Sequence, residues 1–179
     1  MPKERKIDMV ILGLLSHEDL TGYEIKKRID GAISFFWKGS FGSIYPSLQA
    51  MEKDGLVRRF VEESTDNRER IRYSITENGR VALSEWLKDS KVTNDLKYET
   101  LLKLFFGGAT DKEVSVKTIE NFKEDVEKDL AVLKVYEANL KKVLNEEHMY
   151  YYLTVCFGIK TYEAYLIWCE DSLKILNNI

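Results

Sequence analysis

The sequence predicts a mainly helical protein with one small β-hairpin, divided into an N-terminal and a C-terminal domain. Apolar residues recur at helical spacing along most of the 179 residues, whereas the stretch from 57 to 75 shows the alternation of strands. Hydrophobic residues make up 44% of the chain, which is enough for a packed core. A polar segment at 88–95 separates two helical patterns, so we place domains at 1–90 and 91–179.

The N-terminal domain is expected to begin with two amphipathic helices. An apolar face that starts at Ile7 and ends at Leu15 predicts the first helix. Thr21 and Glu24 stand at the spacing of a capping box, which predicts that the second helix starts there. Tyr23 then lies in the exposed first turn of that helix.

A third helix is predicted within GSIYPSLQAMEKDGLV, residues 42–57. Pro46 has no amide hydrogen and is tolerated only in a first helical turn, so the helix begins near Gly42 or Ser43. Gly55 is placed to end it in the left-handed conformation. The side chains expected on display at its N-terminal end are Ser43, Tyr45, Ser47 and Gln49.

A β-hairpin and a fourth helix, which opens at Thr76, complete this domain. The second strand alternates, with Ile71, Tyr73 and Ile75 on one face and arginines on the other. The order of three helices, a hairpin and a helix is that of a winged helix-turn-helix. In such a domain the N-terminal end of the third helix enters the major groove of DNA.

We therefore expect the N-terminal domain to bind double-stranded DNA. A helix N-terminus attracts phosphate, glutamine can contact a base edge, and arginine suits both. The candidate DNA-binding residues are Tyr23, Ser40, Ser43, Tyr45, Pro46, Ser47, Gln49, Arg68, Arg70 and Arg72. Other interpretations stay open, because Tyr45 could pack inside the motif and the arginines could form a solvated hairpin face. Tyr73 is expected in the core.

The C-terminal domain is expected to be entirely helical. A short helix is stopped by Gly107 and Gly108, and a capping box at Thr110 and Glu113 opens a long one. The last helix carries apolar residues at alternating spacings of three and four, together with a second apolar strip, so it should pack against two partners. One partner can be its own chain and the other a second subunit. The residues that we predict to form a homodimer are Tyr152, Val155, Ile159, Tyr162, Leu166, Leu173 and Leu176.

Nearly the whole chain resembles the PadR-type bacterial transcriptional regulators. The resemblance rests on the sequences ILGLL (11–15), GYEI (22–25), GSIYPSLQAMEKDGLV (42–57), RIRYSITENGRVAL (70–83) and LLKLFFGG (101–108). It implies a homodimer that binds a pseudo-palindromic operator, usually as a repressor. In many members a small aromatic or drug-like molecule releases the DNA. This chain departs from a typical member in its wing, where acidic residues stand between the arginines and weaken the attraction for phosphate: Glu62, Glu63, Asp66 and Glu69.

Aromatic residues raise the question of an effector site. Phe36, Trp37 and Trp168 could line a pocket for an aromatic effector, although aromatic residues at helical spacing are also typical of a core. Two other functions stay open, namely a protein–protein adaptor and a binder of hydrophobic small molecules without DNA binding. The near-neutral net charge of −3 permits the adaptor, whereas Ser43, Tyr45 and Gln49 argue against it.

Several classes of protein are not supported by the sequence. No nucleotide-binding or nucleophile motif is present, so neither an enzyme nor a cofactor is expected. Two isolated histidines and two isolated cysteines do not suggest a metal site. The apolar runs are too short to cross a membrane and the N-terminus does not have the pattern of a signal peptide, so we expect a cytoplasmic protein.

Overall fold

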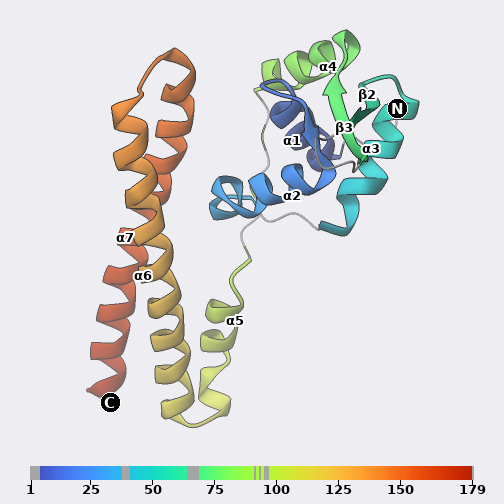
Figure 1. Ribbon diagram of the computed structural model, residues 1–179. Coiled ribbons are helices and arrows are strands. Elements are labelled where there is room, and N and C mark those ends of the chain that lie inside the picture. The colour runs from blue at the N-terminus through green and yellow to red at the C-terminus, as the bar shows by residue number, and fades with distance from the viewer. Residues whose placement is uncertain are drawn as a thin grey trace. The chain divides into compact units, whose positions relative to one another are not determined.

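The computed structural model describes residues 5–37, 41–63, 69–90, 92, 94 and 97–178 (Figure 1). The chain divides into two compact units, residues 1–94 (unit 1) and 95–179 (unit 2). The elements of unit 1 are α1 (Lys6–Leu15), β1 (Leu20–Thr21), α2 (Gly22–Asp30), η1 (Ala32–Phe35), η2 (Phe41–Ser43), α3 (Ile44–Lys53), β2 (Val57–Glu63), β3 (Glu69–Ile75) and α4 (Glu77–Lys88). The elements of unit 2 are α5 (Glu99–Phe105), η3 (Gly107–Ala109), α6 (Lys112–Lys142) and α7 (Glu146–Asn177).

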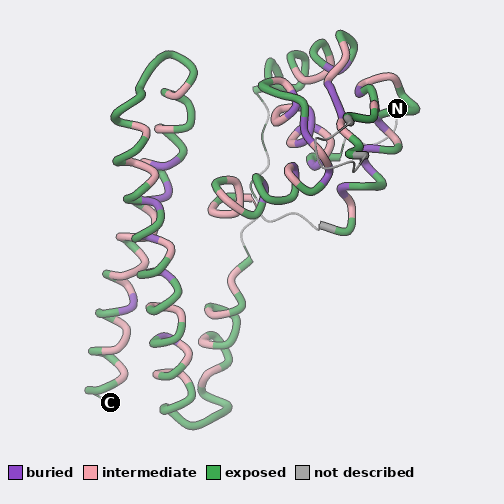
Figure 2. The backbone as a smooth tube through the Cα atoms, in the orientation of Figure 1, coloured by how far each residue is buried: buried purple, intermediate pink, exposed green. Residues whose placement is uncertain are grey.

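One apolar core joins α1, α2, α3 and the sheet of unit 1. Its buried members are Ile7, Met9, Ile11, Leu12, Leu15, Leu20, Ile25, Ile29, Ile44, Leu48, Met51, Val57 and Tyr73. They recur at helical spacing on the three helices, which is why the sequence alone predicts these faces. Figure 2 shows the buried positions of this unit where its elements face one another. Tyr73 belongs to the core, as predicted.

The sheet of unit 1 has three strands, in the order β1-β3-β2, where the sequence predicted a two-stranded hairpin. β1 is only two residues long, and its Leu20 lies opposite Tyr73 of β3. A strand of two residues cannot show an alternating pattern, so sequence periodicity does not detect it. Its pairing ties the start of α2 to the hairpin.

Three predicted helix ends of unit 1 are confirmed. The Thr21 side chain accepts from the Glu24 amide while the Glu24 carboxylate accepts from the Thr21 amide, which is a complete capping box. Gly55 has a φ of 71°, and the amides of Gly55 and Leu56 donate to the carbonyls of Glu52 and Met51. This is a Schellman motif and it ends α3. Thr76 caps α4 through the amide of Gly79.

Unit 2 is an α6–α7 hairpin with the short α5 packed beside α6 (Figure 1). Its buried positions lie where the two long helices run alongside each other, and most of its outer surface is exposed (Figure 2). Gly158 permits close packing, because a Cβ there would lie 3.1 Å from Leu133 Cδ1. The predicted capping box of α6 was wrong. Asp111, not Thr110, is the N-cap residue, and its side chain makes no capping bond.

None of the helices in the described part of the chain is long and apolar enough to cross a membrane.

Candidate nucleic-acid interface

The N-terminal end of α3 is an exposed surface of unit 1. Ser43 occupies the N-cap position and Pro46 is the third helical residue, consistent with its missing amide hydrogen. Tyr45, Pro46 and Gln49 are all exposed on this end of the helix. The first amides of a helix lack intrahelical acceptors and carry the positive end of its dipole, so this surface can receive a phosphate.

Tyr45 is held in place by the glycine that starts α2. A Cβ at Gly22 would lie 2.7 Å from Cε1 of Tyr45, which is closer than side-chain atoms approach. The ring therefore packs directly over Gly22, while 58% of the Tyr45 residue remains exposed. Packing within the motif and display toward a ligand are thus compatible for this side chain. Tyr23, the next residue of α2, is 70% exposed.

The prediction that Ser47 binds DNA was wrong. Its exposed fraction is 0%, so it cannot lie on a DNA-facing surface. The reason is helical spacing, because Ser47 follows Ile44 by three residues and precedes Met51 by four, and both of these are buried. Its hydroxyl oxygen has no hydrogen-bond partner within the described structure.

Two other predicted residues, Ser40 and Arg68, lie outside the described residues. Ser43, Gln49 and Arg70 remain candidates, together with Tyr23, Tyr45 and Pro46.

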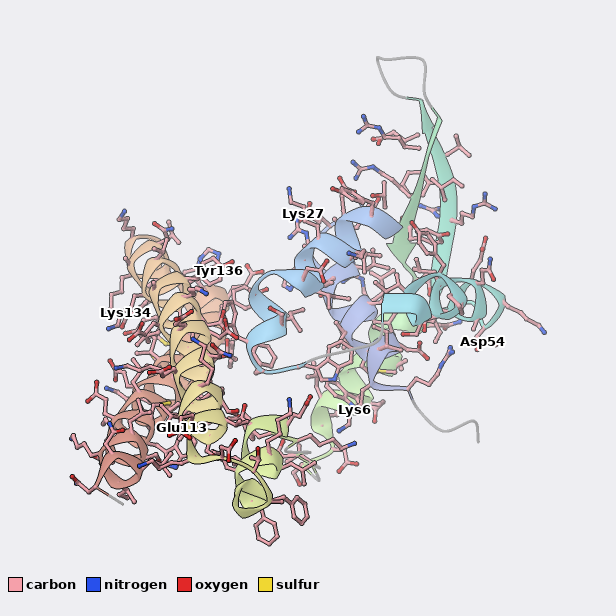
Figure 3. All side chains as sticks on the ribbon, turned by 90° about the horizontal axis from the view of Figure 1, so that it is seen from below. Lys6, Lys27, Asp54, Glu113, Lys134 and Tyr136 are labelled. Atoms are coloured by element: carbon pink, nitrogen blue, oxygen red, sulfur yellow. The ribbon has the colours of Figure 1, made fainter. Side chains whose placement is uncertain are left out.

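The β2–β3 hairpin presents arginines on one face. Figure 3, in which Lys27 marks α2 and Asp54 marks the end of α3, shows the hairpin projecting beyond the helices of unit 1. The strand register pairs Arg58 with Ser74, Phe60 with Arg72, and Glu62 with Arg70. Residues directly opposite each other share a face of a sheet, so Arg58, Arg70 and Arg72 share one with Glu62.

Arg72 is engaged within unit 1. Its Nε donates to Glu62 Oε2 at 2.6 Å, and its Nη1 donates to the carbonyl oxygen of Asp19 at 2.6 Å. Glu24 Oε1 lies 4.0 Å from its Nη2. The Thr21 amide, with a smaller contribution from Arg72, lowers the pKa of Glu24 below its usual value. Arg72 therefore ties β3 to β2 and to the start of α2, which limits its use for phosphate.

Arg58 and Arg70 are the exposed arginines of this face. Arg70 forms no ion pair within the described ranges, and Arg58 Cζ lies 6.0 Å from the centroid of the Phe60 ring. Sequence reasoning left Arg58 out because it did not fix the register of β2 against β3. The signal that could have found it is the alternation of Arg58, Phe60 and Glu62 along β2.

The predicted dimerisation residues lie on the face of α7 that packs on α6 of the same chain. Val155 and Ile159 are buried, and the others are half-buried. Tyr162 hydrogen-bonds Asp129 of α6, and Lys141 of α6 lies 5.9 Å from the Tyr152 ring centroid. These residues of α7 therefore pack against α6 of the same chain.

The predicted effector residues are distributed over both units. Phe36 is exposed and Trp37 packs against the core of unit 1. Trp168 of α7 contacts the Phe122 ring of α6, with ring centroids 6.0 Å apart. Two cavities of about 300 and 450 Å³ lie in unit 2, and none of these three aromatic residues lines them.

No group of three His, Cys, Asp or Glu side chains that could hold a metal ion occurs among the residues that the structure describes.

The order α1, α2, α3, β2–β3 hairpin and α4, with the N-terminal end of α3 exposed, is that of a winged helix-turn-helix protein. Each of the two units matches a known protein family. Residues 11–85 match the transcriptional regulator PadR-like family, and residues 96–177 match the virulence activator alpha C-term family. The chain belongs to the PadR-like family of transcriptional regulators.

Several known proteins are similar to this chain over nearly its whole length. The negative transcriptional regulator PadR of Bacillus subtilis is 24% identical over 97% of this chain and 98% of its own. The structure of that protein in complex with operator DNA has a TM-score of 0.82 at 22% identity, over 96% and 99% of the two chains. The virulence activator AphA of Vibrio cholerae is 30% identical, with a TM-score of 0.73 over 96% of this chain and 98% of its own.

Proposed function

We propose that this chain is a repressor that binds a pseudo-palindromic operator as a homodimer. The observation that carries the proposal is the exposed N-terminal end of α3, where Gly22 fixes the ring of Tyr45 beside Pro46 and Gln49. In this arrangement the helix end receives a phosphate and Gln49 reaches a base edge. Arg58 and Arg70 on the hairpin add contacts to the phosphate backbone.

The relatives support binding to DNA and leave the direction of regulation to experiment. The B. subtilis protein has been crystallised with operator DNA and is named a negative regulator, whereas the V. cholerae protein is named an activator. Repression follows when a bound dimer covers a promoter. A reporter gene behind this protein's own upstream DNA should rise in expression when the protein is deleted, and a fall would reverse the assigned direction.

The test of DNA binding is titration of fluorescent upstream DNA at several salt concentrations. A dimer should protect two half-sites about 10 bp apart, or a multiple of that, because successive major grooves are about 34 Å apart. Gln49→Ala should relax specificity at one base position of each half-site. Binding that is absent at low salt would favour the adaptor function instead.

We assign the dimer contact to the outer face of α7. Large apolar side chains there are exposed at helical spacing, and we call Tyr150, Leu153, Phe157 and Ile167 the outer stripe. Tyr150 and Phe157 are 73% and 68% exposed. Exposed apolar side chains in a stripe of this kind are typical of an interface, and two copies related by a two-fold axis would cover them mutually.

A small aromatic effector that weakens DNA binding is part of the proposal. The B. subtilis relative has been crystallised with p-coumaric acid, which supports an aromatic ligand without assigning its site here. We further propose that the chain catalyses no reaction and acts in the cytoplasm. A binder of hydrophobic molecules without DNA binding would show ligand affinity in calorimetry and no salt-dependent DNA shift.

A further inference from the structure

The β2–β3 hairpin has a second face, which carries Arg59. The strand register places Arg59 of β2 directly opposite Tyr73 of β3. Directly opposite residues share a face, and successive residues of a strand point to opposite faces, so Arg59 and Tyr73 lie on the face opposite to Arg58 and Arg70. Tyr73 belongs to the apolar core of unit 1, to which α3 also contributes. The face of Arg59 is therefore the one that adjoins α3.

The phenol of Tyr73 identifies the side chains beside this face. Burial has the largest effect and raises the pKa of Tyr73, whereas the positive charge of Arg59 lowers it. Glu52 and Tyr45, both on α3, raise the same pKa. α3 packs against β2 at the base of the hairpin (Figure 3). Side chains of α3 and Arg59 of β2 thus lie around one hydroxyl group.

The α3 residues concerned form a single edge of the helix. Tyr45, Gln49 and Glu52 follow each other by four and three residues, so they lie on one side of α3, and all three are exposed. We call them the reading edge, because Gln49 is the residue proposed to contact a base. The seven residues from Tyr45 to Glu52 extend for about 10 Å along the helix axis. Both ends of the reading edge act on the Tyr73 phenol, so this edge lies beside Arg59.

Arg59 is available to a ligand. It is exposed, and it forms no ion pair and no hydrogen bond through its side chain with any residue that the structure describes. Arg72 differs, because its guanidinium is bound to Glu62 and to the Asp19 carbonyl. A guanidinium group donates two parallel hydrogen bonds to a phosphate, and the contact is strongest where no carboxylate of the protein already occupies the donors.

We propose that Arg59 binds a backbone phosphate of the operator next to the base pair that Gln49 contacts. The inference rests on the proposed function, since it assigns one more contact to the same DNA. The reading edge spans about 10 Å and base pairs are about 3.4 Å apart, so this phosphate lies within about three nucleotides of that base pair. A phosphate contact so close to the reading edge fixes the register of α3 in the groove. The contacts proposed for Arg58 and Arg70 come from the opposite face of the hairpin, so Arg59 adds a separate one.

The first test is titration of upstream DNA with the full-length chain at several salt concentrations. Arg59→Ala should weaken binding about tenfold or more, because each half-site loses a hydrogen bond to a charged group. The salt slope should fall by about two, since a dimer loses two phosphate contacts. Arg59→Lys keeps the charge, so it should retain the slope and recover part of the affinity. Lys128→Ala, which removes an exposed cation of unit 2, is the control and should leave both quantities unchanged.

The second test locates the contact on the DNA. In a series of operators, one phosphate at a time is replaced by a neutral methylphosphonate. For the original protein, one such replacement in each half-site should weaken binding within about three nucleotides of the position where Gln49→Ala relaxes specificity. For Arg59→Ala, the same replacement should cause no further loss, whereas replacements elsewhere should keep their effects. A purely structural role of Arg59 would weaken binding without removing the sensitivity to one particular phosphate.

Several outcomes would overturn the assignment of Arg59. They are an unchanged salt slope for Arg59→Ala, and a set of sensitive phosphates that is the same for Arg59→Ala as for the original protein. In both cases the original protein still binds the operator, so the proposed function stands. If circular dichroism shows that Arg59→Ala is unfolded, Arg59→Gln is compared with the original protein on the same methylphosphonate series. If the original protein binds no upstream DNA at any salt concentration, the proposed function and the Arg59 contact both fail.

Discussion

At the scale of single residues, the position of Tyr45 depends on what its neighbour lacks. Gly22 supplies the space that the ring occupies, so the exposed edge of α3 is arranged by a residue on α2. The sequence indicated that Tyr45 matters, but it could not show this contact because the two residues are distant along the chain. For Ser47, in contrast, the sequence alone was sufficient, because its spacing from Ile44 and Met51 already placed it on the buried face of α3.

Gly22→Ala should lower operator affinity by displacing Tyr45. The added methyl group would overlap the ring, which must rotate away from α2. We expect a five- to tenfold loss in DNA titrations, and no further loss when Tyr45→Ala is combined with it. The control is Gly13→Ala on α1, where a Cβ meets nothing within 4 Å. It should raise the free energy of unfolding by about 0.5–1 kcal/mol and leave operator affinity unchanged.

Arg70→Ala and Arg72→Ala should have different effects although both arginines share one face of β3. Arg70 is exposed, so its loss should weaken binding to all DNA sequences and reduce the salt slope by about two in a dimer. Arg72 holds Glu62 and the Asp19 carbonyl, so its loss should lower the free energy of unfolding by about 1 kcal/mol. Equal changes of salt slope for the two variants would contradict this division.

At the scale of elements, local signals predicted three helix ends of unit 1 and the β2–β3 hairpin, but they misplaced the start of α6 and missed the strand β1. Thr21, Gly55 and Thr76 are understood from their immediate neighbours, because capping involves residues three to five positions apart. The two-residue strand β1 and the partner of the α7 seam depend on distant parts of the chain. The regular spacing of the seam predicted a paired helix correctly, but periodicity does not identify which helix pairs with it.

The α6–α7 hairpin should lose stability at alkaline pH through Tyr162. Burial first, and then Asp129, raise the pKa of this phenol from 10 to about 12 in the folded chain. The folded state thus holds the proton more tightly than the unfolded state, so the stabilisation is complete below pH 10 and is lost as the pH rises toward 12. Denaturant titrations should show this fall. Tyr162→Phe should make this fall smaller and leave the part that comes from Tyr165, whose pKa burial also raises, whereas Tyr150→Phe at an exposed position should leave the fall unchanged.

At the scale of the whole molecule, the sequence predicted a homodimer and assigned it to one face of α7. That face packs on α6, and a single chain leaves a different face, the outer stripe, exposed. Which face serves the second copy cannot be read from sequence, because both faces are apolar at helical spacing and the chain itself covers one of them. A charged substitution should therefore have different effects on the two faces.

Phe157→Glu and Ile159→Glu separate these two roles. Phe157 belongs to the outer stripe, so a charge there should leave the helices folded by circular dichroism, give monomers in sedimentation, and reduce operator affinity at least tenfold. Ile159 is buried against α6, so the same charge should unfold unit 2, because a buried carboxylate without a partner is destabilising by several kcal/mol. Val135→Glu is the matched control, since Val135 is an exposed apolar residue of α6 outside the outer stripe. It should remain folded and dimeric. If Phe157→Glu remains dimeric at micromolar concentration, the contact lies elsewhere. If Val135→Glu alone becomes monomeric, the contact belongs to α6.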